Sequence, residues 1–171
     1  MRILIISILI MVMYILQTAL FTHIQFMGAR PDLVLTVVLG AGISAGSIEG
    51  MTVGFLGGLL VDLFRGTFIG LSVPGKVLVG FLAGILPRKV YTDYLWVPVA
   101  TAFLATIIDQ GVFLLLGSSF GLQQPFWTGL RKFVYPSAFY TALLSPLIVY
   151  GVRNLYTDFR RRGWHKGQRL T

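Results

Sequence analysis

Residues 42–70 read GISAGSIEGMTVGFLGGLLVDLFRGTFIG, and the spacing of their glycines decides the fold. Glycine recurs at every fourth position from Gly42 to Gly58. The next position at this spacing is Asp62, and the two after it are Gly66 and Gly70. Residues four apart lie on one face of a helix. Small residues on such a face let helix backbones approach closely in lipid, where a carboxylate is costly and usually faces protein. The stretch therefore predicts tightly packed membrane helices with one acid set into the packed face.

The whole chain has the composition of a membrane protein. Of its 171 residues, 56% are hydrophobic and 12% are charged, whereas soluble domains carry about 25% charged residues. The mean hydropathy is +0.81. The chain has no cysteine, and its two histidines are far apart in the sequence, which argues against disulfides, thiolate chemistry and a metal site. We expect a polytopic protein that needs no cofactor or metal.

A membrane span needs about 20 mainly apolar residues, or fewer where the helix is sheathed by others. The apolar runs predict an all-α integral membrane protein with six transmembrane helices in one compact bundle, residues 1–152, and a basic cytoplasmic tail, residues 153–171. We expect a turn at residues 47–50, although spans two and three also fit one broken element. Pro74 and Gly75 are expected to kink the fourth span. The expected spans are residues 3–22, 33–47, 51–64, 70–86, 94–116 and 133–152.

The positive charges predict the orientation. With six spans both termini share a side, and that side holds nine of the 14 lysines and arginines, the other side four, with Lys76 inside a span. Cytoplasmic flanks of membrane spans are enriched in positive charge. We therefore expect a multi-pass protein with both termini in the cytoplasm, and we assign the net charge of +8 to topology in the lipid bilayer and not to nucleic-acid binding.

Several polar residues fall inside or beside the expected spans. We predict a polar cluster in the outer half of the membrane, in which Lys76 pairs with Asp62 or Asp109 across a helix interface, because paired charges in lipid cost less than lone ones. One interpretation is a structural clamp that fixes helix register, and the other is a site for a solute, an ion or a partner helix. We favour the clamp. The predicted cluster comprises Asp62, Arg65, Lys76, Asp109 and Gln110.

Glycines and one aromatic pair are the candidate contact residues. Glycine-lined grooves are expected to receive helices, either of this chain or of a partner. Phe126 and Trp127 lie in an expected loop beside two positive charges, where they would anchor at the outer interface or dock a partner. The candidate packing glycines are Gly42, Gly46, Gly50, Gly54, Gly57, Gly58, Gly66, Gly70, Gly80 and Gly84.

Three segments resemble a known family. Residues 30–35, RPDLVL, resemble the start of the second helix in the rod-shape-determining MreD family. Residues 54–66 resemble its glycine-rich helix that ends in an acid, and residues 79–84 its next segment. The resemblance is good over residues 30–90.

The resemblance implies a non-enzymatic scaffold in the bacterial inner membrane. Such a protein would control cell shape and lateral peptidoglycan synthesis within the cell-elongation machinery, by binding MreC and wall-synthesis partners. Its fold would be similar to that of the substrate-binding subunits of energy-coupling-factor transporters.

The alternative is a small-solute transporter or the vitamin-binding subunit of such a transporter. Those subunits carry a small-xxx-small pattern on the first helix. The corresponding positions here are Ser7, Met11, Ile15 and Ala19, which are not small throughout and argue weakly against this alternative.

Overall fold

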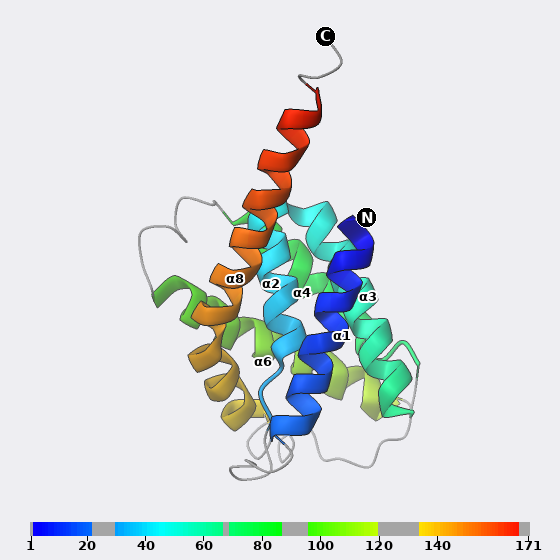
Figure 1. Cartoon of the computed structure of the whole chain (residues 1–171). Helices are drawn as coiled ribbons and strands as arrows, with labels where there is room; N and C mark the ends of the chain where they lie inside the picture. The colour runs from blue at the N-terminus through cyan, green and yellow to red at the C-terminus, as the bar shows by residue number, and fades with distance from the viewer. Residues whose placement is uncertain (1, 22–29, 67–68, 87–95, 120–133, 168–171) are drawn as a thin grey trace.

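The computed structural model describes five stretches of the chain, residues 2–21, 30–66, 69–86, 96–119 and 134–167. Every regular element within them is a helix, so the all-α prediction is confirmed for the described residues. The helices pack side by side in one bundle, with the start of the first and the end of the last at the same end (Figure 1). They are α1 (Arg2–Phe21), α2 (Leu33–Ala45), α3 (Ser47–Arg65), α4 (Val73–Ile85), α6 (Trp96–Ser119) and α8 (Tyr135–Gly167).

Helix α2 is the central element of the bundle. It contacts α1, α3, α4, α6 and α8, and every residue from Leu33 to Ile43 is buried. A helix that is apolar all round must be enclosed by others. Helix α2 is short and has no polar face. The helices around it therefore hold the residues at its two ends in place.

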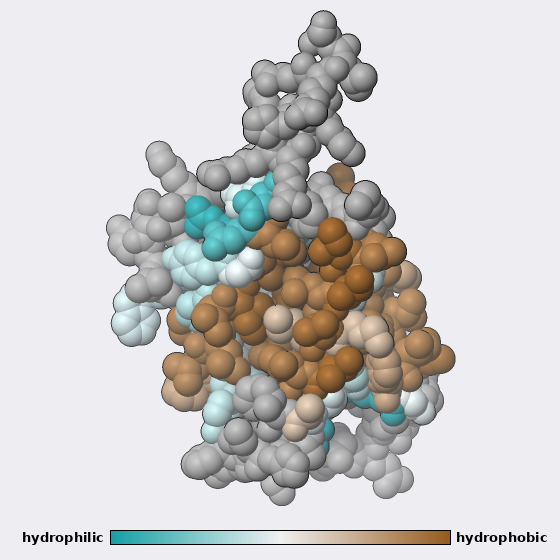
Figure 2. Space-filling model, in the orientation of Figure 1, coloured by the Kyte–Doolittle hydropathy of each residue, from teal (hydrophilic) through white to brown (hydrophobic). Residues whose placement is uncertain are grey.

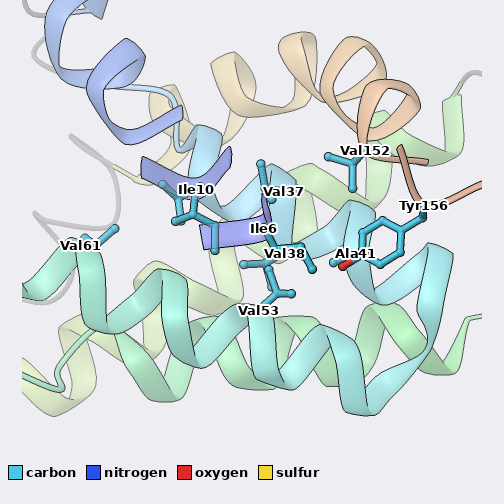
Figure 3. Packing of buried hydrophobic residues seen from close by; sticks show 10 residues of the cluster. Ile6, Ile10, Val37, Val38, Ala41, Val53, Val61, Val152 and Tyr156 are labelled. Atoms are coloured by element: carbon cyan, nitrogen blue, oxygen red, sulfur yellow. The ribbon is translucent and has the colours of Figure 1, made fainter. Parts of the chain in front are cut away.

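Two clusters of apolar side chains fill the space around α2. The first joins α2 to α1, α3 and α8, with Val38 completely buried and the Tyr156 ring covering one end (Figure 3). The second joins α2 to α4, α6 and α8 and includes Leu35, Leu39 and Ala102. The β-branched and small side chains in both clusters allow close packing of helices around the central one.

Gly46 alone separates α2 from α3. Its φ of 100° is in the region that L side chains rarely adopt, and its N–H donates to the carbonyl of Gly42 at 2.8 Å. Glycine enters this region without steric cost. The expectation of a turn at residues 47–50 is wrong, since Ser47 already begins α3. Spans two and three are thus two helices that fold back on each other (Figure 1).

Other expected features of the helices also differ from the structure. Pro74 does not kink α4 but lies in its first turn, where a missing N–H costs nothing. Helix α6 continues through residues 117–119, which were expected to begin a loop. Helix α8 does not end at Val152 but runs to Gly167, so most of the expected basic tail is a continuation of the last helix.

The described surface carries many exposed apolar side chains. In Figure 2 they form a hydrophobic belt across the middle of the visible face. The exposed apolar side chains include Leu4 and Ile8 on α1 and Phe139 and Leu143 on α8. By length and composition α3 and α6 are able to cross a membrane, and α1, α2 and α4 are shorter apolar helices.

Candidate functional site

A buried lysine joins three helices near one end of the bundle. Lys76 lies in the first turns of α4, and only 1% of the residue is exposed. Its Nζ donates to Asp32 Oδ2 and to Asp109 Oδ2, each at 2.8 Å. We call Lys76, Asp32 and Asp109 the lysine cluster. It ties α4 to the start of α2 and to the middle of α6.

Asp32 has two structural tasks in this cluster. It is the N-cap of α2, where its Oδ1 accepts from the Leu35 N–H at 2.8 Å while its Oδ2 accepts from Lys76. A carboxylate at a helix N-terminus satisfies a free N–H and interacts favourably with the helix dipole. Both oxygens of Asp32 therefore have donors, and the side chain fixes where α2 begins.

Neutral polar groups hold the segment that leads into α2. The Asp32 N–H donates to Thr141 Oγ1 of α8 at 3.0 Å, and the Leu33 N–H donates to Gln17 Oε1 of α1 at 2.9 Å. Ser137 Oγ donates to the Arg30 carbonyl at 2.6 Å and accepts from Gln110 Nε2 at 2.9 Å. The start of α2 is consequently fixed by side chains of α1, α4, α6 and α8.

Asp62 organises a separate connection, between α3 and α4. Its carboxylate accepts from the Gly70 N–H at 2.9 Å and from the Ser72 N–H at 2.9 Å, and only 1% of the residue is exposed. Gly66 closes α3 in the left-handed conformation, with its N–H on the Asp62 carbonyl. Arg65 donates to Ser72 Oγ at 3.3 Å and lies 5.5 Å from the centre of the Phe113 ring. Asp62 is thus a backbone clamp for this turn.

We expect Asp62→Ala to lower the thermal midpoint of the purified protein well below that of Asp158→Ala. The change leaves the buried N–H of Ser72 and the half-buried N–H of Gly70 without an acceptor, and a buried unsatisfied donor costs about 1–3 kcal/mol. Asp158 is exposed on α8, so its removal should change little. The measurement is thermal unfolding in detergent, and equal midpoints for the two variants would contradict the clamp.

The glycine register packs α3 directly on α4. A Cβ at Gly50 would collide with the Gly80 carbonyl and one at Gly54 with the Lys76 carbonyl, and one at Gly58 would lie 2.7 Å from Val73 Cα. Reciprocal contacts exist at Gly80 and Gly84, where the neighbours are the backbones of Gly50 and Ser47. Gly42 meets the same stretch of α4 from α2. This chain's own helix fills the groove, which is one of the two occupants that the sequence allows.

The remaining candidate glycines have other surroundings. Gly57 faces Val34 of α2, at 2.9 Å for an added Cβ. Gly46, Gly66 and Gly70 have positive φ and open space around them, so they serve turns and not helix packing.

The structure brings only part of the predicted polar cluster together. Lys76 meets Asp109, one of the two pairings that the sequence allows, and the other predicted partner, Asp62, binds backbone groups. Gln110 follows Asp109 in the chain, but it donates to Ser137, which in turn binds the Arg30 carbonyl and not a member of the lysine cluster. Phe126 and Trp127 lie outside the described residues.

Sequence reasoning missed Asp32, Thr141 and Ser137. Two signals point to them. An aspartate directly before an apolar helix is a typical N-cap. Ser137, Thr141 and Ser145 recur at four-residue spacing in an otherwise apolar segment and therefore lie on one helix face.

The described residues contain no group of three or more His, Cys, Asp or Glu side chains arranged to hold a metal ion. The lysine cluster is closed, because the Lys76 ammonium fills the space between its two carboxylates. The cluster is a buried ion-pair network, which holds three helices in a fixed arrangement and keeps charged groups inside the bundle.

A helical bundle with a hydrophobic belt and charges enclosed inside it is the arrangement of an α-helical membrane protein. The model of the rod shape-determining protein MreD family matches residues 1–159, and the chain belongs to that family. The predicted resemblance is therefore confirmed, and the protein is a bacterial inner-membrane protein of the shape-determining system. Comparisons with curated proteins and with solved structures return no match.

Proposed function

We propose that this protein is a non-enzymatic scaffold of the cell-elongation machinery, which binds MreC and wall-synthesis proteins in the membrane. The observation that carries the proposal is the family match over residues 1–159. Membership implies a role in rod shape determination, and the closed polar interior is compatible with a protein that works by holding partners. The transporter alternative receives no support from the comparisons.

The scaffold needs a contact surface other than the glycine face, which is already occupied. Helices α6 and α8 form an apolar groove of about 480 Å³, with Trp96, Phe103, Phe139 and Leu143 among its lining residues. The small side chains of Ala100 and Ala142 also line it. Aromatic anchors and small residues are the features that favour binding of an apolar helix. We assign this groove to the membrane span of MreC.

The scaffold is tested by affinity purification of the tagged protein from its own membranes, followed by mass spectrometry. Recovery of MreC and wall-synthesis enzymes is the expected result, and complementation of a depletion strain checks that the tagged protein works. Recovery of an ATPase with a coupling subunit, in place of these partners, would overturn the proposal.

We expect the double variant Phe139→Ala with Leu143→Ala to reduce recovery of MreC about tenfold or more, because truncated anchors at the centre of an interface each cost about 1–2 kcal/mol. The matched control is Leu4→Ala with Ile8→Ala, which removes equally exposed apolar side chains from α1. The two double variants should be present in the membrane at equal levels. If the control loses as much MreC, the groove is not the contact surface.

A further inference from the structure

The lysine cluster contains more negative than positive groups. It has two carboxylates and one ammonium, so it carries one excess negative charge if all three are ionised. Asp32 and Asp109 are 7% and 5% exposed, and Lys76 is 1% exposed. An uncompensated charge is expensive in such surroundings, and a buried acid commonly neutralises by taking up a proton.

The two carboxylates are not equivalent. Asp32 has a donor on each oxygen, namely the Leu35 N–H and Lys76 Nζ. Asp109 shares the lysine through Oδ2, but its Oδ1 is buried and has no hydrogen-bond partner among the described residues. Hydrogen bonds to the ionised form stabilise it, and Asp32 also faces the positive end of the α2 dipole. The excess proton therefore belongs on Asp109.

We propose that the lysine cluster binds one proton, held by Asp109 at Oδ1, so that a neutral acid, an ammonium and one carboxylate link α2, α4 and α6. Lys76 then forms its ion pair with Asp32 and donates a hydrogen bond to the acid of Asp109. An unpaired neutral hydroxyl costs less than an uncompensated charge in the same place.

The surroundings of Asp109 Oδ1 favour a proton over a metal ion. The oxygen lies against the first turn of α4, where a Cβ built on Gly75 would be 2.5 Å from it. Glycine at this position makes room for the carboxyl oxygen and little else. A proton needs no coordination shell, whereas a metal cation needs several oxygen ligands.

The other described groups around Asp109 do not supply the missing charge. The α8 side chains that reach this region are neutral: Thr141 accepts from the Asp32 N–H, and Ser137 accepts from Gln110. Arg65 of α3 approaches from the same end of the bundle, where it binds Ser72 and the Phe113 ring. The opposite charge of Asp62 lies one turn away on the same helix and offsets that of Arg65.

The test is infrared spectroscopy of the purified full-length protein in a maltoside detergent, which has no ester carbonyl. We expect the C=O stretching band of a protonated carboxyl at neutral pH, its loss in Asp109→Asn, and its full intensity in Asp158→Asn, the matched control at an exposed site. Replacing sodium by choline in the buffer should leave the band unchanged.

A second measurement keeps the test decisive if Asp109→Asn does not fold. In wild-type protein with ¹³C-labelled aspartate the band should move to lower frequency, and raising the pH should remove it. Absence of the band in the wild type, or its survival in Asp109→Asn, overturns the proposal. A sodium-dependent melting temperature without the band would assign a metal cation to the site instead.

Discussion

Lys76→Met will keep the protein from accumulating in the membrane. The substitution keeps an unbranched apolar side chain that is one atom shorter, and it removes the ammonium that binds both Asp32 and Asp109. Breaking a buried ion pair by removing one partner costs about 3–5 kcal/mol, which is a large part of the 5–15 kcal/mol that stabilises a typical protein. Quantitative blotting of membrane fractions measures the loss.

Two further variants separate charge from packing. Lys166→Met removes the same charge near the C-terminus and should accumulate normally. The triple variant Lys76→Met, Asp32→Asn, Asp109→Asn leaves no charge in the cluster and should recover most of the lost protein, because the main cost of breaking a buried ion pair is the uncompensated charge that remains. Equal levels of Lys76→Met and Lys166→Met would show that the lysine cluster does not support the fold.

Some contacts of the lysine cluster can be predicted from the sequence, and others cannot. The apolar runs locate the helices well, because hydrophobic segments in lipid have few alternatives to the helix. They also predict that Lys76 pairs with an acid, since a lone lysine inside an apolar helix must find one, but they do not choose between Asp62 and Asp109. Asp32 escapes this reasoning because its place is set by the packing of four other helices around the start of α2.

The glycine register also predicts only part of the packing. Its period predicts a tightly packed face, and the structure has one between α3 and α4. The period carries no information about which helix packs there, because an internal and a foreign helix satisfy the same small residues. Helix ends are equally ambiguous: Gly46 and Pro74 show that the same residues mark a turn, a kink or a first helical turn according to their neighbours.

Gly54→Ala will destabilise the protein by about 1–3 kcal/mol or more, the usual cost of inserting a methyl group into a packed interface. The added Cβ meets the Lys76 carbonyl, and a backbone atom cannot rotate away as a side chain does. The two helices must therefore separate, and Lys76 moves with α4. The expected loss is thus larger than that of Gly57→Ala, whose new methyl group meets only the side chain of Val34.

Gly111→Ala on α6 is the matched control, since nothing lies within 4 Å of its added Cβ. There the substitution should be neutral or should stabilise by about 0.4–1 kcal/mol, because alanine has less freedom than glycine in the unfolded chain. Thermal unfolding in detergent should rank the midpoints Gly111→Ala, Gly57→Ala and Gly54→Ala, from highest to lowest. Equal midpoints for Gly54→Ala and Gly111→Ala would mean that α3 and α4 do not pack backbone to backbone. If Gly54→Ala lowers the stability and the recovery of MreC in equal proportion, the glycine face does not contact MreC directly. Its effect on binding then follows from the loss of folded protein.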